Sequence, residues 1–140
     1  MVSNDRAIPI TTVLLAGASG YIGRYVVNAL LDEGLKIVCL YRSASDIDNA
    51  LTLETARVVN LIVDLNNVDS FENESKFFPE FHAVISCVAS RTGGIKDSWN
   101  TEYAANLNLY RLAKRCSVKR FILLSAICVQ KPMLHFQKAK

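Results

Sequence analysis

The sequence of 140 residues lacks long hydrophobic runs and has little net charge, and each absence excludes a class of function. No apolar run approaches the roughly 18 residues of a membrane-spanning helix, so no transmembrane segment is expected. The net charge is only +3, and the basic residues are scattered except at 111–120, which argues against nucleic-acid binding. Residues 1–9 lack the apolar core of a secretory signal, and no transit peptide is visible.

Cysteine pairs at redox or metal-binding spacing are also missing. The four cysteines, Cys39, Cys87, Cys116 and Cys128, include no C-x-x-C motif. We interpret them as reduced, small apolar residues of the core. Internal repeats and low-complexity linkers are absent too, and the length fits one domain.

Apolar runs that resemble strands alternate with helix-like stretches along the whole chain. The runs at 36–41, 82–88 and 119–125 are almost continuously apolar, as in a parallel sheet covered on both faces. This alternation predicts an α/β fold with a doubly wound parallel sheet of about five strands, similar to the Rossmann fold. The expected strands are 10–16, 36–41, 57–63, 82–88 and 119–125, and the expected helices are 21–33, 45–54, 67–78 (helix or turn) and 98–116.

A glycine motif lies where the first strand passes into the first helix. Residues 13–23 read V-L-L-A-G-A-S-G-Y-I-G, with Gly17, Gly20 and Gly23 spaced three apart. In a strand–loop–helix unit this spacing brings the backbone and the helix N-terminus against a dinucleotide pyrophosphate. We therefore predict a phosphate-binding loop, which Ser19, Tyr21 and Ile22 complete. The alternative is a tight turn without a ligand.

The residue that follows the second strand indicates which dinucleotide binds. NAD-binding proteins usually place an acid there, whereas this sequence has Tyr41-Arg42-Ser43. A guanidinium can pair with the 2′-phosphate of NADP, so Arg42 predicts NADPH. Arg24, directly after the motif, is a second candidate for the same phosphate. The alternative for each arginine is a solvated surface residue.

Two further strand ends supply candidate cofactor contacts. Asp64 and Leu65 follow the third strand, where a carboxylate can accept from the adenine amine and leucine can cover the ring. A carboxylate that only starts a turn is the alternative for Asp64. Ala89 and Ser90 follow the fourth strand, where small residues allow close contact with the nicotinamide-side ribose and equally suit plain packing.

These features resemble the short-chain dehydrogenase/reductase superfamily, and two segments resemble one family within it. Residues 86–101 read S-C-V-A-S-R-T-G-G-I-K-D-S-W-N-T, and residues 121–140 read F-I-L-L-S-A-I-C-V-Q-K-P-M-L-H-F-Q-K-A-K. Both are similar to NADPH-dependent divinyl chlorophyllide 8-vinyl reductases. The resemblance implies reduction of the 8-vinyl group of divinyl (proto)chlorophyllide to ethyl, in the chloroplast. It also implies catalytic roles for Lys140 and Ser125, the family's lysine and strand-five serine.

The resemblance comes with one departure from the superfamily. Phe136 stands where the tyrosine of Y-x-x-x-K would be, so the chain lacks the phenol that protonates an alkoxide. Reduction of a carbon–carbon double bond forms no alkoxide, so the loss fits a vinyl reductase. It fits equally a non-catalytic, redox-sensing NADP-binding protein, and it argues against a sugar-nucleotide epimerase. Trp99 could stack on a flat tetrapyrrole or anchor its helix in the core.

The expected domain organisation follows from these assignments. We expect residues 1–9 to be an N-terminal extension and residues 10–140 to be the NAD(P)-binding domain of a longer reductase. A sequence that stops soon after the fifth strand leaves no room for a substrate-binding part. We therefore expect the 140 residues by themselves to be inactive, with a C-terminal segment that frays.

Overall fold

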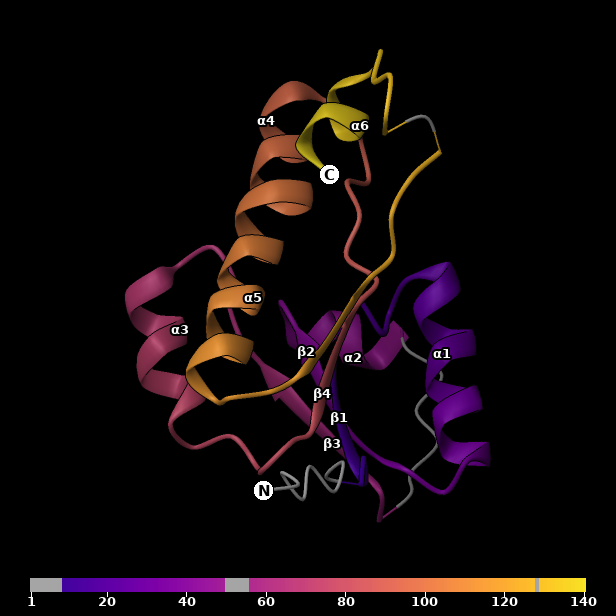
Figure 1. The fold of residues 1–140 in the computed structure, drawn as a ribbon, viewed down its shortest axis with the longest axis vertical. Coiled ribbons are helices and arrows are strands. Elements are labelled where there is room, and N and C mark those ends of the chain that lie inside the picture. The colour runs from indigo at the N-terminus through magenta and orange to yellow at the C-terminus, as the bar shows by residue number, and fades with distance from the viewer. Residues whose placement is uncertain (1–8, 50–55, 128) are drawn as a thin grey trace, which may run out of the picture.

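A single parallel sheet forms the centre of the computed structural model, which describes residues 9–49, 56–127 and 129–140 (Figure 1). The strands follow the order β3-β2-β1-β4-β5, and every neighbouring pair is parallel. The order reverses between β1 and β4, which is where ligands bind in open α/β sheets. The predicted doubly wound fold is confirmed. The strands are Thr12–Ala16 (β1), Lys36–Tyr41 (β2), Val58–Ile62 (β3), Ala83–Ser86 (β4) and Arg120–Leu123 (β5).

The observed helices match the expected ones in the first half of the chain and differ from them in the second half. The helix expected at 98–116 begins earlier, at Ile95, and its second segment is a π-helix. A further short helix covers residues that were expected to fray. The helices are Tyr21–Asp32 (α1), Ala44–Asn49 (α2), Val68–Ser75 (α3), Ile95–Ser98 (α4), Trp99–Ala105 (η1, the π-helix), Asn106–Arg115 (α5) and His135–Ala139 (α6).

Apolar side chains cover both faces of the sheet, because successive residues of a strand point to opposite faces. Leu14 of β1 packs in the cluster that contains Phe71 of α3 and Leu109 of α5. Leu15, its neighbour, packs in the cluster with Leu31 of α1. Figure 1 shows α3 and α5 on one side of the sheet and α1 on the other. These two layers hold the strand ends in place.

The strand β5 differs from the expectation that it is covered on both faces. Arg120 is exposed and Ile122 is 53% exposed. The reason is position, since β5 lies at the edge of the sheet and pairs only with β4 among the described strands. The apolar run alone could not distinguish an edge strand from a central one.

Some expectations concern residues outside the description. Residues 1–8 of the expected N-terminal extension, residues 50–54 of the expected second helix, and Cys128 all lie outside it. Within the described ranges, no helix combines the length and apolar character needed to cross a membrane. Cys39 is buried as expected, but Cys116 is exposed because α5 ends directly before it.

Candidate functional site

A cleft of about 320 Å³ lies at the carboxyl ends of the strands, where the sheet order reverses. Ten of the twelve residues predicted to contact a cofactor line it, whereas Gly23 and Arg24 do not. The sequence therefore predicted the position of the cleft but not all of the residues that line it. The predicted residues that line it are Gly17, Ser19, Gly20, Tyr21, Ile22, Arg42, Asp64, Leu65, Ala89 and Ser90.

The three positions of the motif require glycine for different structural reasons. Gly17 has a φ of +86°, and a Cβ there would lie 2.6 Å from the backbone carbon of Cys87. A Cβ on Gly23 would lie 1.9 Å from the carbonyl oxygen of Gly17. Both glycines are therefore needed for the loop to pack on itself and on the end of β4.

Gly20 is different, because the fold itself leaves room for a side chain. Its φ is −73°, which any residue adopts, and the nearest atom to an added Cβ is 3.4 Å away. Gly20 lines the cleft. The protein's own packing thus gives no reason for a glycine here, whereas a ligand that must approach the backbone does.

The N-terminus of α1 faces this glycine loop with unused hydrogen-bond donors. None of the described side chains caps α1, so its first N–H groups have no side-chain acceptor. Arg24 lies in the first turn, and its Nε is buried with no hydrogen-bond partner in the described part of the chain. Free N–H groups at a helix N-terminus attract phosphate. The free N–H groups at the start of α1 therefore fit a dinucleotide pyrophosphate.

The ends of β2 and β3 form one side of the cleft. Arg42 follows β2, and its Nε is 4.0 Å from Oδ2 of Asp46 in α2. Asp64 follows β3 and accepts a hydrogen bond from the backbone N–H of Asn66 at 2.9 Å. Asp64 therefore starts a turn and lines the cleft at the same time. Leu65 is buried beside it.

Asp46 was not predicted as a site residue, yet it is the most highly coordinated acid on this side. Its Oδ1 accepts from Nη2 of Arg91 at 3.2 Å, and its Oδ2 accepts from the Ser43 hydroxyl at 3.1 Å. Burial raises the pKa of Asp46, but the hydrogen bonds and charges of Arg91, Ser43 and Arg42 lower it more. The pKa lies below its ordinary value, so Asp46 is ionised at neutral pH.

The loop after β4 is built around a second carboxylate, that of Asp97. Its Oδ2 accepts from the Ser90 hydroxyl at 2.5 Å and from the backbone N–H groups of Arg91 and Thr92 at 3.1 and 3.2 Å. Its Oδ1 accepts from Thr101 at 3.0 Å. These donors, Ser90 first, hold the pKa of Asp97 well below its usual range. Asp97 thereby fixes the loop that forms one lip of the cleft.

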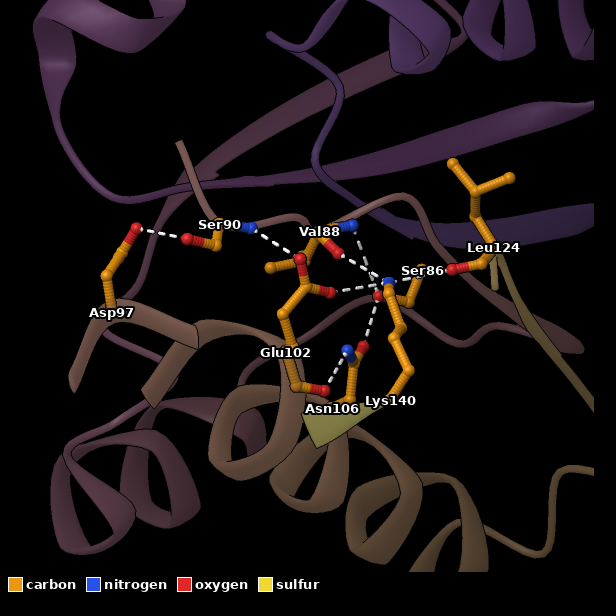
Figure 2. A network of polar contacts seen from close by, with 8 residues as sticks. All are labelled: Ser86, Val88, Ser90, Asp97, Glu102, Asn106, Leu124 and Lys140. Carbon is orange, nitrogen blue, oxygen red and sulfur yellow. Dashed lines mark hydrogen bonds and ion pairs between the residues drawn. The ribbon is translucent and has the colours of Figure 1, made fainter. Parts of the chain in front are cut away.

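Behind this loop lies a buried ion pair between Lys140 and Glu102 (Figure 2). The two side chains are 4% and 3% exposed, and Nζ of Lys140 is 2.7 Å from Oε2 of Glu102. Nζ also donates to the carbonyl oxygens of Leu124 and Val88, at 2.7 and 3.1 Å. Oε2 has no hydrogen-bond donor of good geometry, so the ion pair is what balances its charge.

Glu102 connects this pair to the β4 end. Its Oε1 accepts from the backbone N–H of Ser90 at 2.7 Å, and its carbonyl accepts from Asn106, which accepts from the Ser86 hydroxyl. Lys140 does not line the cleft, but Val88 and Leu124, whose carbonyls it holds, do. In this structure Lys140 positions the cleft wall rather than pointing into the cleft.

The other catalytic candidate, Ser125, is exposed and follows Leu124 directly. It does not line the cleft either. Trp99 is 42% exposed and packs edge-to-face on Tyr103, so it is not anchored in the core. Cys87 lines the cleft, and burial raises the pKa of its thiol while the charge of Lys140 lowers it.

Sequence reasoning missed Asp46, Arg91 and Glu102. Glu102 had a usable signal, because it falls on the apolar stripe that continues through Ala105, Leu109 and Leu112. A charged residue on a buried helix face requires a partner. Nothing in the sequence pairs Arg91 with Asp46, since their contact spans 45 residues.

A family model described as NAD(P)H-binding matches residues 17–139. The chain belongs to this NAD(P)H-binding family. The glycine loop and the capless start of α1, both within the matched range, are the parts of the chain that this membership explains best. The predicted nicotinamide cofactor is therefore confirmed at the level of NAD(P).

Curated relatives are more specific. One is the chloroplastic divinyl chlorophyllide a 8-vinyl-reductase of Oryza sativa subsp. indica, 41% identical over 137 residues, which cover 93% of this chain and 33% of that protein. The reductase of the same name from Arabidopsis thaliana is 42% identical over 91% of this chain and 32% of its own. The chain spans about a third of the length of the curated relatives it matches.

Solved structures agree with the fold. A short chain dehydrogenase from Burkholderia cenocepacia J2315 in complex with NADP has a TM-score of 0.78, with 17% identity over 92% of this chain and 60% of its own. At this identity the likeness supports the architecture alone.

Proposed function

We propose that this chain is the cofactor-binding part of an NADPH-dependent reductase that converts the 8-vinyl group of divinyl chlorophyllide or protochlorophyllide to ethyl, in the chloroplast. The observation that carries the proposal is the 41% identity to a plant 8-vinyl-reductase over 93% of the chain. Two segments that resemble this family, 86–101 and 121–140, include the loop around Asp97 and the Lys140 side chain. Residues of both segments line the cleft, among them Ser90 of the first and Leu124 of the second.

The choice of NADPH rests on the residues at the end of β2. Arg42 lines the cleft where NAD-binding proteins carry an acid. Asp46, four residues on, has its oxygens occupied by Arg91 and Ser43 and is poorly placed to accept from a ribose hydroxyl. Arg42 is 57% exposed and lies 4.0 Å from Asp46, so its guanidinium keeps N–H donors that can pair with a 2′-phosphate.

The proposed cofactor contacts are those that line the cleft; Gly23 and Arg24 do not line it, and Gly23 packs against the Gly17 carbonyl. When bound, NADPH supplies the hydride, and the protein orients it against the vinyl group. Lys140 and Ser125 are the proposed residues at the reacting end. Lys140 reaches it through the carbonyls of Val88 and Leu124, and Ser125 by adjoining Leu124. Residues 10–140 are thus proposed to form one NAD(P)-binding domain.

The function is tested by transplanting this chain into a known enzyme. Residues 1–140 replace the segment of the rice reductase that aligns with them, and the chimera is incubated with divinyl chlorophyllide and NADPH. We expect conversion to the monovinyl pigment, measured by chromatography, and none with the isolated 140 residues. An Arg42→Asp chimera should lose at least about tenfold in kcat/KM with NADPH.

An inactive chimera that is folded and binds NADPH would contradict the reductase assignment. It would favour the non-catalytic NADP-binding alternative that the missing tyrosine also allows. Equal kcat/KM with NADPH and NADH in the unmutated chimera would contradict the cofactor choice alone.

A further inference from the structure

Two arginines from opposite sides of the cleft converge on one carboxylate. Arg42 follows β2, whereas Arg91 belongs to the loop after β4, and β1 lies between those strands. Oδ1 of Asp46 accepts a hydrogen bond from Nη2 of Arg91 at 3.2 Å, and its Oδ2 lies 4.0 Å from Nε of Arg42. All three residues line the cleft. The contact between Arg91 and Asp46 therefore joins the two sides of the cleft above the end of β1.

The charges at this point are unbalanced. Among these three residues, two guanidiniums, 57% and 66% exposed, share one carboxylate that is 14% exposed, so one positive charge is in excess. Asp64, which also lines the cleft, makes no ion pair with either arginine in the described part of the chain. Both guanidiniums keep further N–H donors, because each has five and the two carboxylate oxygens can accept only a few of these hydrogen bonds. A small dianion with several acceptor oxygens, such as a phosphate monoester, fits this arrangement better than the carboxylate does.

The backbone of Arg91 is held before any ligand arrives. Its N–H donates to Asp97, as does that of Thr92, and the neighbouring Ser90 is fixed by both Asp97 and Glu102. A guanidinium on a rigid loop loses less freedom when it binds than one on a mobile loop. Binding an anion should therefore cost Arg91 less conformational entropy than its exposed side chain alone would suggest.

We propose that Arg91 is a second specificity-determining residue for the 2′-phosphate of NADPH, which it and Arg42 bind by exchanging Asp46 for the phosphate. This rests on the proposed use of NADPH. The exchange breaks the two contacts to Asp46 and forms contacts to the phosphate oxygens, with no covalent change. Asp46 occupies the arginines in the absence of the dinucleotide, so a 2′-phosphate must displace it to reach them.

The test uses the 140-residue chain and two halves of the cofactor. 2′,5′-ADP carries the 2′-phosphate, and 5′-AMP lacks it but is otherwise the same. Affinities are measured by calorimetry for the unmutated chain, Arg91→Met, and the matched control Lys96→Met, which removes an exposed cation of the next helix outside the cleft. We expect Arg91→Met to weaken 2′,5′-ADP at least tenfold and 5′-AMP less than twofold. Lys96→Met should change both less than twofold.

The Asp46→Asn variant tests the exchange itself. Removing the competing charge should strengthen 2′,5′-ADP about threefold and leave 5′-AMP unchanged, whereas weaker binding would overturn the exchange. Equal effects of Arg91→Met on both ligands, or none on either, would overturn the role of Arg91. An unmutated chain that does not distinguish the two ligands would instead contradict the proposed use of NADPH.

Discussion

At the scale of single residues, the glycine motif shows that one pattern can have two causes. The fold requires Gly17 and Gly23, since a Cβ at either would overlap backbone atoms. Gly20 has an ordinary φ and room for a side chain, so its reason lies in what occupies the cleft. Sequence spacing could identify the motif but could not separate these causes, because they depend on distances across the loop.

Substituting Gly20 should therefore affect binding and spare the fold. We expect Gly20→Ser to keep the free energy of unfolding within about 0.5 kcal/mol, because serine is as good an N-cap as glycine. NADPH affinity should fall at least tenfold, and Gly20→Val should abolish binding. Calorimetry and urea unfolding measure the two effects.

Gly23→Ala is the control for this prediction. Its Cβ would displace the Gly17 carbonyl, so it should lose about 3 kcal/mol of stability or fail to fold. If Gly20→Ser bound NADPH as tightly as the unmutated chain, the loop would not hold the phosphate.

At the scale of elements, the loop after β4 depends on Asp97 rather than on its two glycines. The carboxylate accepts from two backbone N–H groups and three hydroxyls between Ser90 and Thr101. The expected strand at 82–88 and helix at 98–116 left a loop between them, but the sequence did not predict the shape of that loop. The shape of the loop depends on Asp97, seven residues after Ser90, because its carboxylate accepts the hydrogen bonds of the surrounding N–H and hydroxyl groups.

The loop should consequently contribute stability that depends on pH in one direction. The pKa of Asp97 is lower in the folded chain than its unfolded value of about 3.9. Its stabilisation is therefore complete above that value and is lost as pH falls towards the folded pKa. We expect Asp97→Asn to cost about 1–2 kcal/mol at pH 7, and the difference from the unmutated chain to shrink below about pH 4.

Thermal unfolding between pH 3 and pH 8 measures this difference. Asp48→Asn, which removes an exposed carboxylate from α2, should show no such pH-dependent gap. A gap for Asp97→Asn that stays constant with pH would mean that the carboxylate charge does not hold the loop.

At the scale of the whole molecule, the fold class was predictable from the sequence, whereas the contacts between distant segments were not. Continuous apolar runs and short loops fix a doubly wound sheet, and the strand ends then fix the cleft. Lys140 was expected to lie in a frayed segment. In the structure α6 forms, and the side chain is buried between η1 and the ends of β4 and β5. Nothing local in K-A-K predicts a partner 38 residues earlier.

Breaking this ion pair should destabilise the whole domain. We expect Lys140→Met to cost about 3–5 kcal/mol in urea unfolding, because it leaves a buried carboxylate without a counter-charge. Adding Glu102→Gln should recover most of the loss, since the amide oxygen can still accept from Ser90. A cost below about 1 kcal/mol for Lys140→Met would mean that the lysine is solvated, as the sequence alone suggested.

The π-helix η1 has a consequence for insertions and deletions. A π turn closes its hydrogen bonds one residue later than an α turn, so it absorbs an extra residue without lengthening the helix by a turn. Deleting one residue between 99 and 105 would therefore restore ordinary α-helical hydrogen bonds and leave Leu109 of α5 facing the core. A deletion in a regular α-helix would instead rotate everything beyond it by about 100°. A one-residue deletion in η1 should thus change the direction of Glu102, the acid that pairs with Lys140, and spare the packing of α5.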